Sequence, residues 1–258
     1  MHDYFHTFYF NGHFLYELGA VIAQPPTHIT SMRDINFESI PGRSGDSIVD
    51  NGRYTNKTLR FPIRAVPAFC SLSLQEFKYE LTEWLQADDY TYKEYRDTYN
   101  PGYFRKGIVT EIEQTVAVKY DVYETAITFN FAPFLYNDNG LNKVVYNSTK
   151  NAVDAVDEVE ATLENPEMWD SEPVIRIIGN GSFSCLIGDV TFGINNVVDE
   201  ITIDKPNENV YDKDGVPCND KITAIKLPSL LSGTNVIRVI GVGDTEFTLE
   251  IIPNWRRL

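Results

Sequence analysis

The loop Gly42-Arg43-Ser44-Gly45 is the first stretch whose residue types could do chemistry. Glycine-rich loops hold phosphates, and a serine between glycines can be a nucleophile. However, the loop lacks the lysine and spacing of a P-loop, and the strand-like stretch after it offers no helix N-terminus to an anion. Gly45 follows Ser44 at once, which excludes the Gly-x-Ser-x-Gly spacing. We therefore expect a turn at the corner of a β-sandwich, with Gly42 and Gly45 at positive φ.

Glu111 and Glu113 form the second pattern with catalytic potential, because two carboxylates on one strand face are a spacing known in some glycosidases. Acid–base chemistry would require one of them to be buried with a raised pKa. The chain carries 37 acidic residues, so pairs of this kind arise by chance. We expect both glutamates on an exposed face, and a hydrolase that uses this pair stays an alternative.

The histidines do not form a metal site by their spacing. His2 and His6 would share one face of a strand, but no third ligand lies near them in the sequence. His13 and His28 are isolated. The acidic run 151–172 lacks the glycine and the alternating oxygen ligands of a calcium-binding loop. From these patterns we assign no catalytic, cofactor-binding or metal-binding residues.

The charge balance restricts the partners. The chain has 22 basic and 37 acidic residues, a net charge of −15. Such a surface repels phosphates, which bind to clustered Lys and Arg, so the composition excludes a sequence-specific nucleic-acid reader. A lining along which DNA slides without sticking stays open. No apolar run approaches the ~18 residues of a membrane helix, and no signal peptide is visible, so we predict no membrane partner.

The three cysteines also argue against a covalent or metal framework. Cys70, Cys185 and Cys218 lie far apart and form no Cys-x-x-Cys motif. A disulfide network or a zinc knuckle is therefore not expected. We expect synthesis in a reducing cytosol.

The elements that must position these residues are mainly β-strands. The chain of 258 residues has room for two domains, and its 15 tyrosines and 15 phenylalanines favour strands. The stretch 59–66 alternates apolar residues with Arg60 and Arg64, as a half-buried strand requires. Asn11-Gly12 predicts a hairpin turn with a return strand over 14–18. Pro133 should end the strand that begins near residue 125.

One helix is predicted over residues 74–86. Ser73 and Glu76 have the spacing of a capping box, and Leu72 can pack on Phe77 as a hydrophobic staple. The apolar stripe of this helix is Phe77, Leu81, Trp84 and Leu85. Because this stripe has helical spacing, we expect the helix to pack on a sheet.

The second half reads as a β-sandwich of short strands. Residues 137–140 are Asn-Asp-Asn-Gly and mark a boundary, which divides the chain into domains 1–140 and 141–258. The segment 151–172 has eight acids and no base, and is interpreted as a solvated connector or a short exposed helix. The predicted strands that follow are 174–178, 183–187, 190–194, 200–204, 222–227, 236–240 and 247–252.

Several short motifs, each weak alone, occur along nearly the whole chain in a specific order. In the first half they are Asn11-Gly12, Ile40-Pro41-Gly42-Arg43-Ser44-Gly45-Asp46, Asn51-Gly52-Arg53-Tyr54, Glu83-Trp84-Leu85, and the run from Phe129 to Tyr136. In the second half they are the run from Glu172 to Gly181, Ile203-Asp204, the run from Leu227 to Ile237, and Ile252-Pro253-Asn254-Trp255-Arg256. In order and spacing this set resembles the distal tail (Dit) protein family of siphophages and their prophages in Gram-positive bacteria.

The resemblance implies a mainly β fold of two β-sandwich domains. The N-terminal sandwich, with its single helix, would form a ring of six copies at the tail tip. The C-terminal sandwich would be galectin-like and lie on the outside. The ring would join the tail tube and tape-measure protein above to a lysin or fibre hub below. Receptor-binding proteins are often carried as well. The protein would thus be a virion component made in the cytoplasm of the bacterial host, without enzymatic activity or cofactors.

Two further hypotheses follow from the residues. In the alternative function, the C-terminal sandwich is a carbohydrate-binding module that recognises cell-wall polysaccharide of the host through exposed aromatic side chains. Within the ring hypothesis, Arg60 and Arg64 would help to present a surface of the first sandwich to a neighbouring copy.

Overall fold

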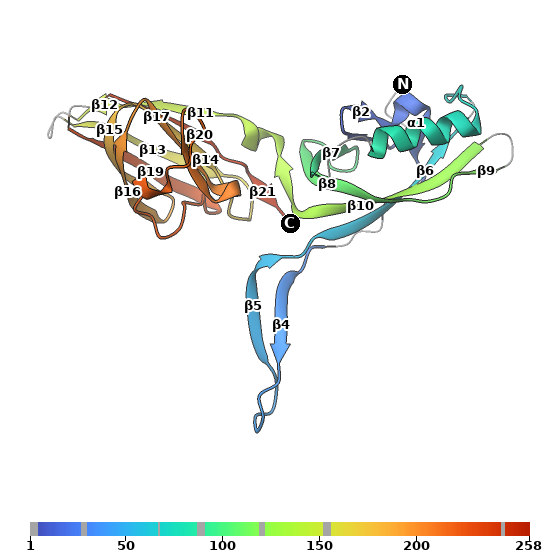
Figure 1. Cartoon of the computed structure of the whole chain (residues 1–258), viewed down its shortest axis with the longest axis horizontal. Helices are drawn as coiled ribbons and strands as arrows, with labels where there is room; N and C mark the ends of the chain where they lie inside the picture. The colour runs from blue at the N-terminus through green and yellow to red at the C-terminus, as the bar shows by residue number, and fades with distance from the viewer. Residues whose placement is uncertain are drawn as a thin grey trace. The chain divides into compact units, whose positions relative to one another are not determined.

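The computed structural model describes residues 5–26, 30–66, 68–86, 91–118, 122–151, 156–243 and 246–258. The chain folds into two compact units, Met1–Leu135 together with Leu258, and Tyr136–Arg257. Strands dominate both units, and α1 (Leu74–Gln86) is the one α-helix in the described ranges (Figure 1). The predicted mainly β fold with a single helix is confirmed.

The first unit is built on an antiparallel sheet. Its strands are β1 (Phe8–Phe10), β2 (His13–Phe14), β3 (Ala20–Ile22), β6 (Lys57–Ala65), β7 (Lys93–Asp97), β8 (Tyr103–Ile112), β9 (Val116–Val118) and β10 (Val122–Asn137). The order across the sheet is β2-β1-β7-β8-β10-β6-β3, and β9 also pairs with β10. Two more strands, β4 (Arg33–Glu38) and β5 (Ser47–Tyr54), pair only with each other.

The core of the first unit lies between this sheet and α1. Strand β6 alternates as predicted, with Leu59, Phe61 and Ile63 buried. The capping box forms, since the Ser73 amide donates to Glu76 and the Glu76 amide donates to the Ser73 hydroxyl. The helix buries the predicted stripe Phe77, Leu81, Trp84 and Leu85. These contacts fix the helix on the sheet.

Two predicted boundaries in the first unit are wrong. The return strand after Asn11-Gly12 is only β2, because the chain enters a 3₁₀ helix, η1 (Leu15–Leu18). Pro133 does not end its strand, since β10 continues to Asn137. The ladder between β10 and β6 reaches only Phe131, so the proline removes no hydrogen bond from it.

The second unit is a β-sandwich of two five-stranded sheets. One has the order β11-β20-β14-β17-β18 and the other β12-β13-β19-β15-β16. The strand bounds are β11 (Val144–Asn147), β12 (Thr149–Lys150), β13 (Asp157–Asn165), β14 (Val174–Ile178), β15 (Gly181–Ile187), β16 (Val190–Val197), β17 (Glu200–Asp204), β18 (Asn209–Asp212), β19 (Gly233–Val242) and β20 (Thr248–Ile252). The short strand β21 (Arg256–Arg257) belongs to neither of these two sheets. Short 3₁₀ helices are η3 (Asp138–Leu141), η4 (Lys205–Asn207) and η5 (Asn219–Lys221).

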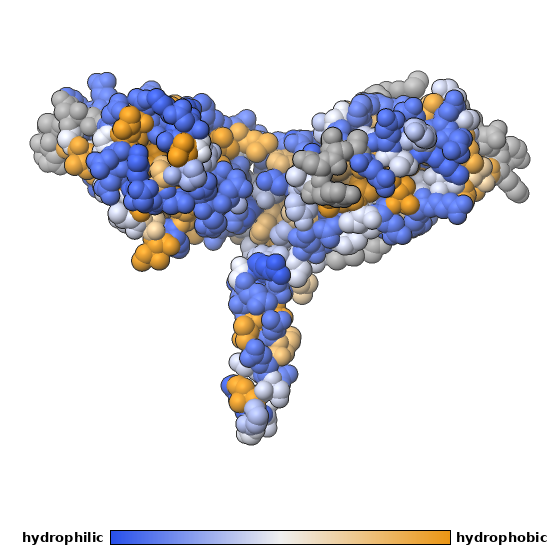
Figure 2. All heavy atoms as spheres, viewed as in Figure 1, coloured by the Kyte–Doolittle hydropathy of each residue, from blue (hydrophilic) through white to orange (hydrophobic). Residues whose placement is uncertain are grey.

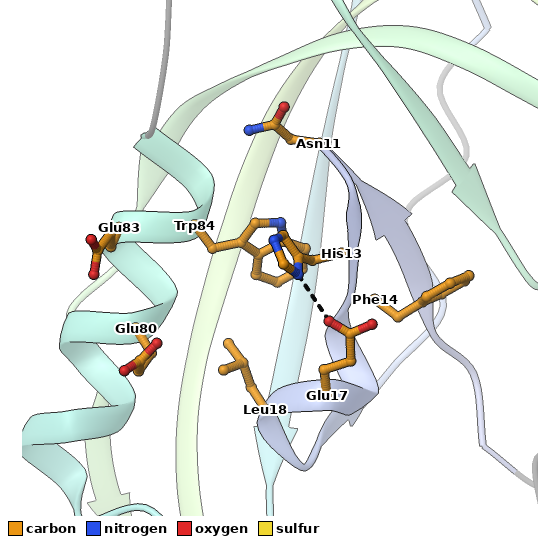
Figure 3. A pocket seen from close by; sticks show the side chains of 8 residues that line it. All are labelled: Asn11, His13, Phe14, Glu17, Leu18, Glu80, Glu83 and Trp84. Carbon is orange, nitrogen blue, oxygen red and sulfur yellow. Dashed lines mark hydrogen bonds and ion pairs between the residues drawn. The ribbon is translucent and has the colours of Figure 1, made fainter.

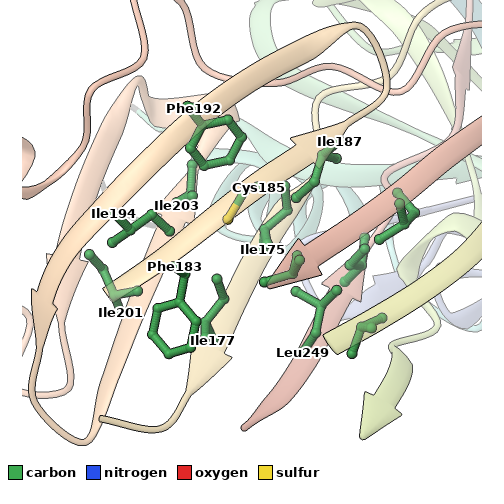
Figure 4. Packing of buried hydrophobic residues seen from close by; sticks show 14 of the residues in the cluster. Ile175, Ile177, Phe183, Cys185, Ile187, Phe192, Ile194, Ile201, Ile203 and Leu249 are labelled. Carbon is green, nitrogen blue, oxygen red and sulfur yellow. The ribbon is translucent and has the colours of Figure 1, made fainter. Parts of the chain in front are cut away.

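The core of this sandwich takes side chains from both sheets. Phe183 and Cys185 of β15 meet Ile177 of β14 and Ile201 and Ile203 of β17 in one buried cluster (Figure 4). Strands β14 and β17 have the predicted bounds, because each alternates apolar and polar residues between clear turns.

The interpretation of the acidic segment as a connector or a short helix is wrong where the structure describes it. Residues 157–165 form β13, which pairs along its length with β19. Val159 points into the core, whereas Glu160 and Glu164 are exposed. The predicted strand at 222–227 is also wrong: β18 completes its sheet instead, by pairing with β17.

Candidate interaction surfaces

The glycine-rich loop is not a corner of a sandwich. It is the tip of a β-hairpin made of β4 and β5, and we call residues 33–54 the arm (Figure 1). Gly42 and Gly45 have φ values of 81° and 88°, so they adopt the predicted left-handed conformation. Arg43 and Ser44 between them are exposed. The loop therefore turns the hairpin and presents side chains to solvent.

The arm leaves one apolar face uncovered. Phe37 lies opposite Ile48 in the hairpin register, and Ile35 lies two residues away on the same face. The relative exposures of Phe37 and Ile48 are 63% and 65%. No residue of β4 or β5 is buried. In the space-filling view, apolar side chains stand out among the polar ones of the arm (Figure 2).

Ion pairs hold the two strands of the arm together. Arg53 Nε donates to Asp34 Oδ2 at 2.6 Å, and Arg33 Nη2 lies 2.8 Å from Asp50 Oδ2. These arginines hold the pKa values of both aspartates below the usual range. A two-stranded hairpin is marginal in water, and a contiguous exposed apolar patch marks a site of interaction. The arm is therefore the strongest candidate for contact with another protein.

A second apolar surface lies on the body of the first unit. Phe5, Phe14, Tyr16 and Phe69 surround a cavity of 360 Å³, which we call the aromatic groove. All four rings are exposed, and they contact one another in pairs. The Phe5 and Phe69 centroids are 5.7 Å apart, and those of Phe14 and Tyr16 are 5.0 Å apart. The groove is therefore a preformed aromatic surface.

A second cavity, which we call the acidic cup, shares the lining residue Phe14 with the groove. Figure 3 shows the residues that line the cup. It is a cavity of 560 Å³ between α1 and the β2–η1 segment, and no Lys or Arg lines it in the described residues. Its acids are Glu17, Glu80 and Glu83, and its other lining residues are Asn11, His13, Phe14, Leu18 and Trp84. The carboxylate of Glu17 pairs with His13, whose Nδ1 lies 3.0 Å from Glu17 Oε2. The cup suits a cationic side chain.

The two glutamates with catalytic spacing do not form an acid–base pair. Glu113 receives two hydrogen bonds from Arg60, at 2.5 and 2.8 Å, while Glu111 is exposed. The hydrogen bonds from Arg60 lower the pKa of Glu113, which is the opposite of what a general acid needs. Arg64 donates to Glu124. Both arginines are thus paired with glutamates of the same chain. The arm is therefore a stronger candidate than these arginines for contact with another copy of the chain.

The histidines and cysteines have structural surroundings. His6 contacts Thr98 at 3.1 Å and stacks on Tyr99, while His2 and His28 lie outside the described residues. In the described ranges no group of three or more His, Cys, Asp or Glu could hold a metal ion. The three cysteines are free and buried, and burial raises the pKa of one of them, Cys185, to about 12. No described helix is long and apolar enough to span a membrane.

The surface of the second unit is different in kind. Its exposed large apolar residues are aliphatic, and none in the described ranges is aromatic: Leu141, Val145, Met168, Val198, Val216, Ile225, Leu231, Val236 and Val242. One sheet carries a charge ladder instead, in which Arg176 pairs with Glu200 and Glu250. Sugar binding by stacking needs exposed rings. In the described part of this unit no aromatic side chain is fully exposed, and Tyr146, Trp169 and Tyr211 are only partly exposed.

Comparison with known proteins shows which fold the chain shares. No protein-family model and no curated protein matches the chain. Among solved structures it is similar to the Dit protein of phage SPP1, described as a paradigm of the hub adsorption apparatus in phages that infect Gram-positive bacteria. The match has a TM-score of 0.66 and 12% identity, and covers 98% of this chain and 99% of that one. The chain has the fold of this Dit protein.

Proposed function

We propose that the protein is a distal tail protein, a structural hub at the tail tip of a phage or prophage. Two independent observations support this proposal. The ordered motifs from Asn11-Gly12 to Trp255-Arg256 resemble the distal tail family, and the SPP1 Dit fold matches 98% of the chain. In this proposal the first unit forms the ring, and the second unit is a galectin-like sandwich without catalytic activity.

The single observation that carries the ring is the uncovered arm. Phe37 and Ile48 expose an apolar face that no part of the described chain covers. The apolar face of the arm differs from the surfaces on the body of the same unit. A contact between the arm of one copy and the body of another is therefore heterologous, because two different surfaces meet. Heterologous contacts repeat from copy to copy and close into a ring when the rotation allows. Six copies would give the hexamer.

The ring would join several tail components. We propose that it connects the tail tube and the tape-measure protein to a lysin or fibre hub, with receptor-binding proteins as further partners. The net charge of −15 supports a channel through which DNA passes without binding. The protein would be assembled into the virion after synthesis in the host cytoplasm.

Electron microscopy and light scattering of the purified chain test this proposal. Over a range of concentrations we expect closed rings, either for the chain alone or after the tail-tube partner is added, since ring closure depends on concentration and on bound partners. A chain that remains a monomer at all concentrations and does not bind the tail-tube partner contradicts the proposal. Binding of the chain to purified cell-wall polysaccharide would instead favour the carbohydrate-binding alternative.

A further inference from the structure

The outer strands of the second unit differ in what covers their free edges. In one sheet the outer strand β18 carries a bridge between Tyr211 and Pro217, and the other outer strand, β11, has only four residues. In the other sheet Ile194 of the outer strand β16 bridges Ile222. The chain itself thus protects the edges at β16 and β18. An edge strand without such protection is a template for pairing with another strand.

Strand β13 is different, because most of its length has a partner on one side only. Its ladder with β19 runs from Glu158 to Asn165, whereas β12 on its other side pairs only with Asp157 and Glu158. In the described chain, residues 159–165 therefore have no strand on that side, and we call this run the open edge. It contains no proline and no lysine, two residues that often protect edge strands.

The inner side chains of the open edge show that a neighbouring strand is missing. Val159 is buried in the core of the sandwich. Ala161 and Leu163 share the face of Val159, because alternate residues of a strand point to the same side. They pack against the core but are only partly buried. An additional strand beside β13 with apolar side chains on this face would cover them.

The outer face of the open edge is negative. Glu160 and Glu164 are exposed on it, and neither forms an ion pair with the described residues. Arg238 is the one base in the ladder of β13 with β19, and it pairs with Glu158 at 3.5 Å. Lys150 of β12 lies beyond the end of the open edge. The outer face thus keeps two negative charges that no base of the ladder neutralises.

We propose that the open edge binds an extended segment of another protein as an additional strand, in which apolar side chains alternate with Lys or Arg. Main-chain hydrogen bonds to β13 would hold this segment, as in other cases of strand addition. Its apolar side chains would cover Ala161 and Leu163. Its basic side chains would lie beside Glu160 and Glu164, where cross-strand pairs of opposite charge are stabilising.

Charge favours this partner over a second copy of the chain. Antiparallel pairing of two β13 strands about Thr162 would place Glu160 of each copy opposite Glu164 of the other. Like charges directly opposite each other are destabilising, whereas a basic strand has the reverse effect at the same positions. Because β13 belongs to the second unit, this partner is independent of the ring that we propose for the first unit.

A synthetic peptide that alternates valine with lysine over the length of the open edge is the probe. We expect it to bind the full chain at low salt, as measured by fluorescence anisotropy, because salt screens exposed charges. The same peptide with glutamate in place of lysine should bind at least about tenfold more weakly. Methylation of the backbone amides of the lysine peptide should also abolish binding, because the charges remain but the donors to β13 are lost.

Charge reversal in the protein tests where the peptide binds. Glu160→Lys combined with Glu164→Lys should exchange the preference, so that this variant binds the glutamate peptide better than the lysine peptide. Asp214→Lys combined with Asp220→Lys makes the same change in net charge at exposed residues outside β13, and should keep the wild-type preference. Amides in residues 159–165 should exchange hydrogen more slowly when the lysine peptide is bound.

An exchanged preference together with new protection of residues 159–165 supports the proposed strand addition. Absence of binding, equal binding of the methylated peptide, or protection confined to other residues would overturn it. A wild-type dimer that protects residues 159–165 would assign the open edge to a second copy and would also overturn it. Absence of rings contradicts the proposed function alone and does not affect binding at the open edge.

Discussion

The arm and the second unit use the same residue pattern with opposite outcomes. In both, apolar residues alternate with polar ones along antiparallel strands. In the second unit two sheets cover each other, and Phe183 is 2% exposed. The arm has one layer, and Phe37 on it is 63% exposed. Alternation thus decides which side chains share a face, whereas a second layer decides whether that face is buried.

The arm is the part of the described chain where an apolar strand face has no covering layer. The free energy of folding of the second unit includes the burial of its apolar faces. The apolar face of the arm contributes little to folding of the monomer, because water still reaches it. It can contribute when another surface covers it.

The largest difference is expected for one substitution made in both regions. Phe183→Ala should lower the free energy of unfolding by about 3–5 kcal/mol, because it leaves a cavity in a closed core. Phe37→Ala should lower it by less than about 0.5 kcal/mol, because its ring is already hydrated. Chemical denaturation measures both values. Equal losses of unfolding free energy in the two variants would mean that the monomer itself covers Phe37. That result would contradict the difference between the arm and the second unit.

Two glycines with positive φ provide a second contrast. At Gly19 an added Cβ would lie 2.4 Å from the Phe69 carbonyl oxygen, so backbone would have to move. At Gly42, in the tip of the arm, nothing lies within 4 Å of such a Cβ. Gly19→Ala should therefore cost more than about 2 kcal/mol, and Gly42→Ala about 1 kcal/mol from the backbone conformation alone. Thermal unfolding that ranks them in the reverse order would contradict this packing.

Lys57 is the first residue of β6, the strand that follows the arm in the chain. Its side chain is buried, and burial, with a smaller contribution from Arg105, lowers its pKa to about 8. The unfolded chain then binds more protons than the folded one between about pH 8 and 10.5, so stability should rise with pH in that window. Lys57→Met should stabilise the protein by about 1–3 kcal/mol at pH 7.

Denaturation at several pH values checks this effect. The advantage of Lys57→Met over wild type should be constant below pH 8 and shrink as the pH approaches 10.5. An advantage that does not change with pH would assign the effect to packing rather than to the buried charge.

A smaller effect than that of Lys57 is expected at the start of α1, the helix that carries both core and cup residues. Ser73→Ala removes a hydrogen bond to the Glu76 amide and should cost about 1 kcal/mol of unfolding free energy. Trp84 should stay in place, because its Nε1 donates to the Phe10 carbonyl oxygen at 2.8 Å. Association should therefore be unchanged when folding is complete. A strong loss of association in a folded Ser73→Ala variant would show that a contact between copies involves the helix end.

Local signals were sufficient where short-range chemistry decides the structure. The capping box and the apolar stripe predicted α1, and clear alternation between turns predicted β14 and β17. The acidic run hid β13, because eight acids obscure the alternation that places Val159 in the core. The segment forms a strand because it pairs with β19, although its acidic composition is typical of an exposed connector.

The surfaces were less predictable than the core. Ile35 and Phe37 showed their alternation in the sequence, but nothing local tells whether a second layer will cover them. The aromatic groove brings Phe69 together with Phe5 and Phe14, which lie far from it in the chain. Such a surface depends on tertiary contacts and leaves no spacing to detect.

In the proposed function, the uncovered face of the arm mediates self-assembly. Sedimentation velocity tests this role under the conditions in which the wild type forms rings. The measurement compares the wild type with the Phe37→Asp, Ile48→Asp double variant. We expect the double variant to sediment as a monomer, with a thermal unfolding midpoint close to that of the wild-type monomer. Rings of unchanged size formed by a folded double variant would contradict it.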